Sequence, residues 1–283
     1  MGSSIRYPMT FRGVGDELKS LGVRPSKNLG QNFLTDGTIA DWIVARACIL
    51  PDERVLEIGP GLGILTQRLA QATKNLTVIE LDRRLASNLQ NTSTFKVIQG
   101  DALQVELPDF DKVVSNLPYQ ISSGITMRLL DKGFAKAVLM FQKEFAEHLV
   151  AKPGTSSYSR ISVMAGYRAE SKIVKHVSKG CFHPVPKVDS AIVEIEPMPP
   201  KFEIFDEHTF TETVRMLFSH KNRKVRNGIM AEHDGLGLDK EQARRMAEEL
   251  PYNNMRPITL SPEKLAEIAN KIHTSKGDYL PSK

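Results

Sequence analysis

The chain has 283 residues, of which 41% are hydrophobic and 25% are charged, a composition typical of a folded globular protein. This composition excludes a disordered or fibrous chain, and the length allows one large domain, or a large domain with a small one. The 38 basic and 33 acidic residues give a net charge of +5, which permits a polyanionic partner without requiring one.

Short β-branched segments alternate with segments of helical period from residue 54 onward. This alternation is typical of a parallel sheet flanked by helices, an α/β fold. Ahead of it, apolar residues at helical spacing over 39–50 predict an amphipathic helix that covers one edge of a ligand cleft. The seven predicted strands are Arg54 to Ile58, Leu76 to Glu80, Phe95 to Gln99, Lys112 to Asn116, Ala137 to Phe141, Lys172 to His176 and Ser190 to Glu196.

A proline-rich segment, Pro197 to Pro200, ends this pattern. Proline lacks a backbone donor and cannot continue the interior of a strand or helix, so the segment predicts a domain boundary. Beyond it, apolar residues recur at helical spacing in three places between residues 210 and 272. We therefore predict an α/β domain over residues 1–199 and a small all-α domain over residues 200–283.

The segment Val55 to Thr66 predicts a strand, a glycine-rich turn and the start of a helix. Gly59, Gly61 and Gly63 stand at alternate positions, and glycine tolerates positive φ and lets a ligand approach the backbone. Glu80 ends the next predicted strand, where a carboxylate can accept hydrogen bonds from both ribose hydroxyls. These features predict a nucleotide-like ligand, and the same geometry also serves NAD.

The spacing of the glycines narrows the choice of ligand. It is G-x-G-x-G, not the G-x-G-x-x-G of dinucleotide enzymes, and Glu57 precedes it. Asp101 follows the third predicted strand. This pattern resembles the S-adenosylmethionine (SAM) methyltransferases, in which an acid such as Asp101 accepts a hydrogen bond from the adenine amine of the cofactor. Taken alone, Asp101 also suits a turn or a helix cap.

The tetrapeptide Asn116-Leu117-Pro118-Tyr119 follows the fourth predicted strand, at the carboxyl edge where open α/β sheets bind ligands. A purine amine is a poor nucleophile because its lone pair is delocalised into the ring. Acceptors that hold its N–H groups favour pyramidal geometry, and the Asn116 side-chain oxygen and the backbone carbonyl of Leu117 or Pro118 can be those acceptors. Proline stiffens the loop, and Tyr119 offers a face for the base. The tetrapeptide therefore indicates methylation of a purine amine.

Five segments, in this order, resemble the dimethyladenosine transferases, which modify two adjacent adenines near the 3′ end of small-subunit ribosomal RNA. The resemblance covers residues 27–196 and is only general beyond residue 200. It implies a Rossmann-like, seven-stranded SAM-dependent methyltransferase sheet, a helical C-terminal domain, and N6,N6-dimethylation of adenines in ribosome biogenesis. The segments are Gly30-Gln31-Asn32-Phe33-Leu34, Glu57 to Thr66, Glu80-Leu81-Asp82, Asn116 to Tyr119, and Phe182 to Ser190.

The resemblance also implies the roles of individual residues. Tyr119 and Phe182 are expected to converge on the target adenine as an aromatic clamp, and no metal is implied because positioning of the reactants dominates such a transfer. The implied catalytic residues are Asn116, Leu117, Pro118, Tyr119 and Phe182. The implied SAM contacts are Asn32, Leu34, Gly59, Gly61, Glu80, Asp101 and Asn116.

A cluster of cations begins the predicted second domain. Together with the family resemblance, it predicts a strip that binds RNA phosphates. Without that resemblance, a solvated helix face is the simpler interpretation. The cluster consists of Lys221, Arg223, Lys224 and Arg226.

Three alternatives share parts of this pattern. A DNA adenine methyltransferase needs the same tetrapeptide chemistry, although the second domain is small for DNA recognition. A non-catalytic RNA-binding assembly factor would keep the fold, but the intact Asn116 and glycine loop argue against lost catalysis. The related antibiotic-resistance methyltransferases of large-subunit RNA share the tetrapeptide, whereas the long late motif and the second domain favour the small-subunit branch.

The cellular setting follows from what the sequence lacks. No segment approaches the roughly 18 consecutive apolar residues of a membrane span, and the first residues form no apolar signal core. Cys48 and Cys181 are the two cysteines, and they lie far apart in the sequence, which favours a reducing compartment. We expect a cytoplasmic monomer that binds small-subunit ribosomal RNA or a pre-small-subunit particle, and neither membrane nor DNA.

Overall fold

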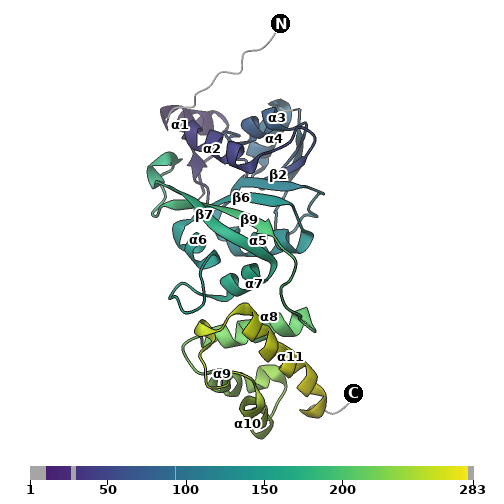
Figure 1. Cartoon of the computed structure of the whole chain (residues 1–283). Coiled ribbons are helices and arrows are strands. Elements are labelled where there is room, and N and C mark those ends of the chain that lie inside the picture. The colour runs from purple at the N-terminus through teal and green to yellow at the C-terminus, as the bar shows by residue number, and fades with distance from the viewer. Residues whose placement is uncertain (1–10, 27–29, 93, 280–283) are drawn as a thin grey trace. The chain divides into compact units, whose positions relative to one another are not determined.

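The computed structural model describes residues 11–26, 30–92 and 94–279, which form two compact units (Figure 1). The first unit takes in the chain up to Ala146 together with Glu170–Pro197. The second takes in Glu147–Ala169 together with the chain from Met198 onward.

The first unit is built on a seven-stranded sheet in the order β4-β3-β2-β5-β6-β9-β7. Strands β2 to β6 pair in parallel, so their carboxyl ends share one edge of the sheet. The α/β class is confirmed, and a strand forms at each of the seven predicted places. The strands are β2 (Arg54–Ile58), β3 (Asn75–Glu80), β4 (Lys96–Gln99), β5 (Lys112–Asn116), β6 (Lys136–Gln142), β7 (Ala169–Val177) and β9 (Ser190–Pro197).

The direction of β9 corrects the prediction of a parallel sheet. It runs antiparallel to β6, with Ser190 opposite Gln142 and Ile195 opposite Ala137. The chain between β7 and β9 forms only the short 3-10 turn η2 (Lys179–Cys181) and β8 (Phe182–His183). Parallel neighbours need a long crossover, usually a helix, and the connection from β7 to its neighbour β9 has none, so β9 reverses direction relative to β7.

Helices cover the sheet of the first unit. Helix α2 begins behind Asp36, whose carboxylate accepts hydrogen bonds from the amides of Thr38 and Ile39. It packs on β5 and β6 and lines no part of the cleft described below, so its predicted place at the cleft edge is corrected. The helices are α1 (Phe11–Ser20), α2 (Gly37–Ala47), α3 (Thr66–Ala72), α4 (Arg83–Thr92), α5 (Ser122–Lys132) and α6 (Lys143–Leu149).

A two-stranded ribbon, which the sequence did not predict, fixes the N-terminal motif. Strand β1 (Phe33–Leu34) pairs antiparallel with β8, so that Leu34 lies opposite Phe182. Helix α1 contributes Leu18 to a buried apolar cluster that also contains Phe33 and Leu62. The ribbon and the cluster together hold the N-terminal motif against the glycine-rich loop.

The second unit is helical. Tyr158 is fully buried in it, donates from its hydroxyl to the carbonyl oxygen of Leu260 at 3.0 Å, and packs edge-on against Phe218. Such contacts place Glu147–Ala169 with the C-terminal helices, whereas the predicted division kept it in the first domain. The elements are α7 (Arg160–Arg168), α8 (Glu207–Ser219), α9 (Val225–Ala231), η3 (His233–Leu236), α10 (Lys240–Glu249), η4 (Pro257–Thr259) and α11 (Pro262–Tyr279).

None of the described helices is both long enough and apolar enough to cross a bilayer.

Candidate active site

A cleft opens at the carboxyl edge of the parallel strands. Its volume is about 1100 Å³, including the part open to solvent. Four of its walls follow β2, β3, β4 and β5, and the fifth is the segment Gly30–Leu34 before α2. The position at the carboxyl ends of the strands is the one expected for ligand binding in an open α/β sheet.

The glycine-rich loop after β2 needs glycine for two reasons. Gly59 and Gly61 have φ values of +69° and +60°, which residues with a side chain rarely adopt. A Cβ on Gly59 would meet the Pro118 ring at 3.0 Å, and one on Gly61 would meet the Phe33 ring at 2.9 Å. The loop can therefore pack this closely against the other walls of the cleft only with glycine at both positions.

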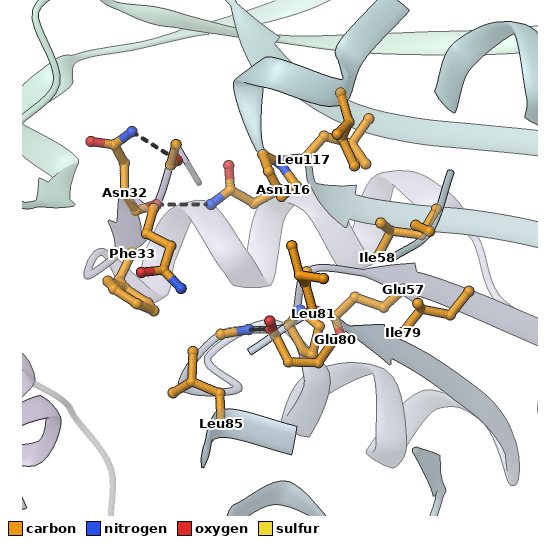
Figure 2. Close-up of a pocket in the computed structure, with 18 of the residues that line it drawn as sticks. Asn32, Phe33, Glu57, Ile58, Ile79, Glu80, Leu81, Leu85, Asn116 and Leu117 are labelled. Atoms are coloured by element: carbon orange, nitrogen blue, oxygen red, sulfur yellow. Dashed lines mark hydrogen bonds between the residues drawn. The ribbon is translucent and has the colours of Figure 1, made fainter. Parts of the chain in front are cut away.

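Glu80, at the end of β3, ties the wall of the cleft to the loop. Its carboxylate accepts a hydrogen bond from the Gly61 amide at 3.0 Å (Figure 2). It also accepts one from the Asp82 amide at 2.8 Å. Burial raises the pKa of Glu80, while these backbone amides act in the opposite direction. Each carboxylate oxygen can accept more than one hydrogen bond, so Glu80 can also receive hydroxyl donors from a ligand.

Glu57 is a cleft residue to which sequence reasoning gave no role. Its side chain lies at the end of β2, is only 1% exposed, and lines the cleft. Its Oε2 atom has no hydrogen-bond partner among the described residues. Burial raises the pKa of Glu57 to about 8, the neighbouring Thr66 hydroxyl acts in the opposite direction, and the negative charge of Glu80 adds to the rise. An acid at the end of an otherwise buried strand was the available signal in the sequence.

The protonation of Glu57 makes the stability of the ligand-free protein depend on pH. A carboxyl with a raised folded-state pKa binds more protons in the folded than in the unfolded protein. The protonated carboxyl contributes its full stabilisation below the pKa that Glu57 has in the unfolded chain. This stabilisation is lost as the pH rises toward about 8. Glu57→Gln mimics the protonated acid, so its melting temperature should fall less than that of wild type between about pH 6 and about pH 9.

Differential scanning calorimetry of the two proteins in matched buffers measures this difference. Glu80, whose pKa burial also raises, is present in both proteins and so does not account for a difference between them. Parallel pH profiles for wild type and Glu57→Gln would show that Glu57 is ionised throughout.

Three other predicted cofactor residues also line the cleft. The Asp101 carboxylate accepts a hydrogen bond from the Leu103 amide at 2.8 Å, so the residue shapes a turn as well as facing the cleft. Leu34 is almost fully buried beneath the N-terminal wall. The Asn32 side chain donates to the Gly30 carbonyl at 3.1 Å, which keeps that wall compact.

Asn116, at the end of β5, is held in one amide orientation. Its Nδ2 donates to the backbone carbonyl of Asn32 at 3.4 Å (Figure 2). With the nitrogen used in this way, Oδ1 is the atom left to accept a hydrogen bond, and no described residue donates to it. A buried or half-buried amide is expected to use both its ends, so the arrangement leaves one acceptor for a ligand.

The rest of the tetrapeptide is fixed by its surroundings. Leu117 is buried, and its amide donates to the Met140 carbonyl at 3.2 Å. The Pro118 carbonyl accepts from the Ile121 amide at 3.2 Å and so begins the short 3-10 turn η1 (Tyr119–Ile121). Of the two carbonyls considered from the sequence, that of Leu117 has no backbone donor among the described residues, which favours it as the second acceptor.

The structure corrects the place predicted for Phe182. Its side chain is fully buried and belongs to the main apolar core, together with Leu34 and Ile43. It does not line the cleft, because pairing of β8 with β1 turns it into the core. Burial of a large apolar side chain is worth about 1.5–3 kcal/mol, so leaving the core to stack on a base would be costly. In this structure Phe182 therefore faces the core and not the cleft.

The basic cluster lies in the second unit, at the turn between α8 and α9. Arg223, Lys224 and Arg226 are exposed and form no ion pair with a described residue. Lys221 differs from the predicted phosphate-binding role. Its half-buried ammonium donates to the carbonyls of Ser156 at 3.1 Å and Tyr158 at 3.4 Å. Its position and contacts are those of a residue that stabilises a loop.

Comparisons with known proteins agree on one family. The family model described as ribosomal RNA adenine dimethylase matches residues 23–260. A protein named probable ribosomal RNA small subunit methyltransferase A, from Thermococcus kodakarensis, is 43% identical over 87% of this chain and 89% of its own length. One of the same name from Methanosarcina mazei is 44% identical over 87% of this chain and 92% of its own length.

Two solved structures are similar over most of the chain. The dimethyladenosine transferase from Plasmodium falciparum has a TM-score of 0.71 and 29% identity, and covers 87% of this chain and 98% of its own. The 23S rRNA methyltransferase ErmE has a TM-score of 0.61 and 27% identity, and covers 86% of this chain and all of its own.

Proposed function

Because the chain belongs to the ribosomal RNA adenine dimethylase family, we propose that it transfers methyl groups from SAM to the N6 atoms of two adjacent adenines near the 3′ end of small-subunit ribosomal RNA. The observation that carries the proposal is the orientation of Asn116. Its nitrogen is bound to the Asn32 carbonyl, and its oxygen is left as an acceptor for an amine. The proposed enzyme acts as a cytoplasmic monomer in ribosome biogenesis.

The residues that line the cleft suit SAM in their chemistry. The glycine loop lets a ligand approach backbone amides, and Glu80 offers a carboxylate to ribose hydroxyls. Asp101 stands where an adenine amine can donate to it, and the unpartnered Glu57 oxygen can accept a hydrogen bond from the ligand. Bound SAM supplies an electrophilic methyl group. The residues proposed to hold it are Asn32, Leu34, Gly59, Gly61, Glu80, Asp101 and Asn116.

The tetrapeptide is proposed to activate the target amine. The Asn116 Oδ1 and the Leu117 carbonyl accept its two N–H bonds, which draws the nitrogen lone pair out of conjugation. The Pro118 ring restricts the backbone that carries both acceptors, and Tyr119 provides a face for the adenine ring. Positioning supplies most of the effect, and well-oriented reactants can contribute about 7–11 kcal/mol. In each transfer the nitrogen takes the methyl carbon as the bond from that carbon to sulfur breaks, and the methylated nitrogen then releases a proton to water. One of the two acceptors can hold the single N–H that remains for the second transfer.

The second unit is proposed to bind the RNA backbone. Arg223, Lys224 and Arg226 project cations that no described carboxylate neutralises, and such groups release counterions when they contact phosphates. Lys221 is left out of this proposal because its ammonium is already bound to loop carbonyls.

A methyl-transfer assay distinguishes the proposed substrate from the alternatives. Labelled SAM is incubated in parallel with small-subunit particles, naked small-subunit RNA, large-subunit RNA and duplex DNA. We expect label in the small-subunit arms, on adenines that become dimethylated. Label only in DNA would replace the proposal with a DNA adenine methyltransferase, and label only in large-subunit RNA would replace it with the resistance-type activity. Binding without any label would favour an assembly factor.

Glu80→Ala is expected to weaken SAM binding by about tenfold to a hundredfold. It removes a charged acceptor for the ribose and also the anchor of the Gly61 amide, and hydrogen bonds to charged groups are worth about 1.5–3 kcal/mol. Isothermal titration calorimetry with SAM measures the change. Glu53→Ala is a matched control, because Glu53 lies before β2 and away from the cleft. Unchanged affinity in Glu80→Ala would remove Glu80 from the site.

A further inference from the structure

Because Phe182 is buried, Tyr119 is the aromatic residue of the predicted pair that faces the cleft. Two aromatic side chains line the cleft among the described residues, Phe33 and Tyr119. Phe33 is buried in the apolar cluster that contains Leu18 and Leu62. The half-buried Tyr119 is therefore the aromatic ring available to stack on an incoming base, and its orientation decides where the base can lie.

The Tyr119 ring is held at its far end by a residue outside the catalytic loop. The Tyr119 hydroxyl and the Ser190 Oγ are 2.7 Å apart, the usual distance for a hydrogen bond between two hydroxyls. Burial raises the pKa of Tyr119, so the phenol keeps its proton at physiological pH. The ring is fixed at one end by the backbone of η1 and at the other by Ser190.

Ser190 is itself a rigid anchor. It is fully buried at the start of β9, where it lies opposite Gln142 of β6. The residue before it, Asp189, is held from two sides. Its carbonyl accepts from the Lys143 amide at 2.9 Å, and its carboxylate accepts from the Lys179 amide at 2.9 Å. The Ser190 hydroxyl therefore has a position set by the sheet and not by the loop that it supports.

We propose that Ser190 is a positioning residue that holds the Tyr119 ring ready to stack on the target base, an inference that rests on the proposed function. A ring fixed in advance loses little rotational freedom when the base arrives, so the base is presented to Asn116 in one orientation. Ser190 touches neither the base nor SAM. It acts through Tyr119, and its effect disappears when Tyr119 lacks a hydroxyl.

A double-mutant cycle tests this coupling. The variants are Ser190→Ala, Tyr119→Phe and the two combined, and the readouts are kcat with saturating small-subunit RNA and the Kd of SAM. We expect each single variant to lower kcat by about threefold to tenfold, the range of one neutral hydrogen bond. The double variant should be no slower than either single variant, and the Kd of SAM should stay at the wild-type value in all three.

A merely structural role would give a different pattern. Thr126→Ala is the matched control, because Thr126 is also a buried hydroxyl in the first unit, bonded to the Ser122 carbonyl at 2.7 Å. It should keep the wild-type kcat. Wild-type kcat in Tyr119→Phe, or additive losses in the double variant, would overturn the proposal. If Ser190→Ala fails to fold, the kcat of Tyr119→Phe alone tests the proposal, because this variant keeps the ring and loses only the hydroxyl that Ser190 binds. An inactive wild-type protein would instead contradict the proposed function.

Discussion

Asn116→Ala is expected to lower kcat for methyl transfer by about a hundredfold or more, while the protein keeps its fold. The substitution removes the Oδ1 acceptor that holds the target amine in its reactive geometry. Loss of one such preorganised group at a reacting centre costs about 10²–10³ in kcat. Asn116 is only half-buried and its Nδ2 bond to Asn32 is long at 3.4 Å, so the cost in stability should be small.

Single-turnover kinetics with saturating SAM and RNA measure this loss, and the melting temperature shows whether the fold is kept. Asn75→Ala is the matched control, because Asn75 is an exposed asparagine at the start of β3, whose side chain donates to the Asp52 carbonyl at 2.8 Å. It should transfer methyl groups at the wild-type rate. Turnover in Asn116→Ala similar to that of wild type would show that Asn116 only shapes a turn.

The second large effect is expected at the RNA surface. Replacing Arg223, Lys224 and Arg226 together with glutamine should weaken RNA binding and flatten its dependence on salt. Each lost phosphate contact removes about 0.7–0.9 from the slope of log affinity against log salt, so three contacts should remove about two to three. The affinity for SAM should not change, because the three residues belong to the second unit and the cleft belongs to the first.

A second triple variant separates local contacts from net charge. Arg215, Arg244 and Arg245 are also exposed arginines of the second unit, but they form ion pairs with Glu212, Glu248 and Glu241. Replacing these three with glutamine changes the net charge equally. We expect a smaller change in the salt slope than in the first triple variant. Equal changes would mean that net charge alone matters, and an unchanged slope in the first variant would mark its cations as solvated surface.

The fold class and most of the cleft could be predicted from local sequence patterns. The alternation of β-branched and helical segments predicted all seven strands because burial on both faces of a sheet requires continuous apolar runs. The glycine loop, Glu80, Asp101 and Asn116 were predicted to meet because each follows a parallel strand, and those ends share one edge. Local spacing was sufficient here, since each of these residues takes its place from its own strand.

Features that depend on a second segment far away in the chain could not be predicted in this way. Phe182 lies in the core because β8 pairs with β1, and Lys221 is bound because its ammonium meets the loop carbonyl of Ser156. The Ser190 contact with Tyr119 joins β9 to the catalytic loop in the same way. A motif specifies residue types at fixed spacing, but the face that a side chain presents depends on which distant backbone pairs with its own. That pairing is set by packing of the whole unit.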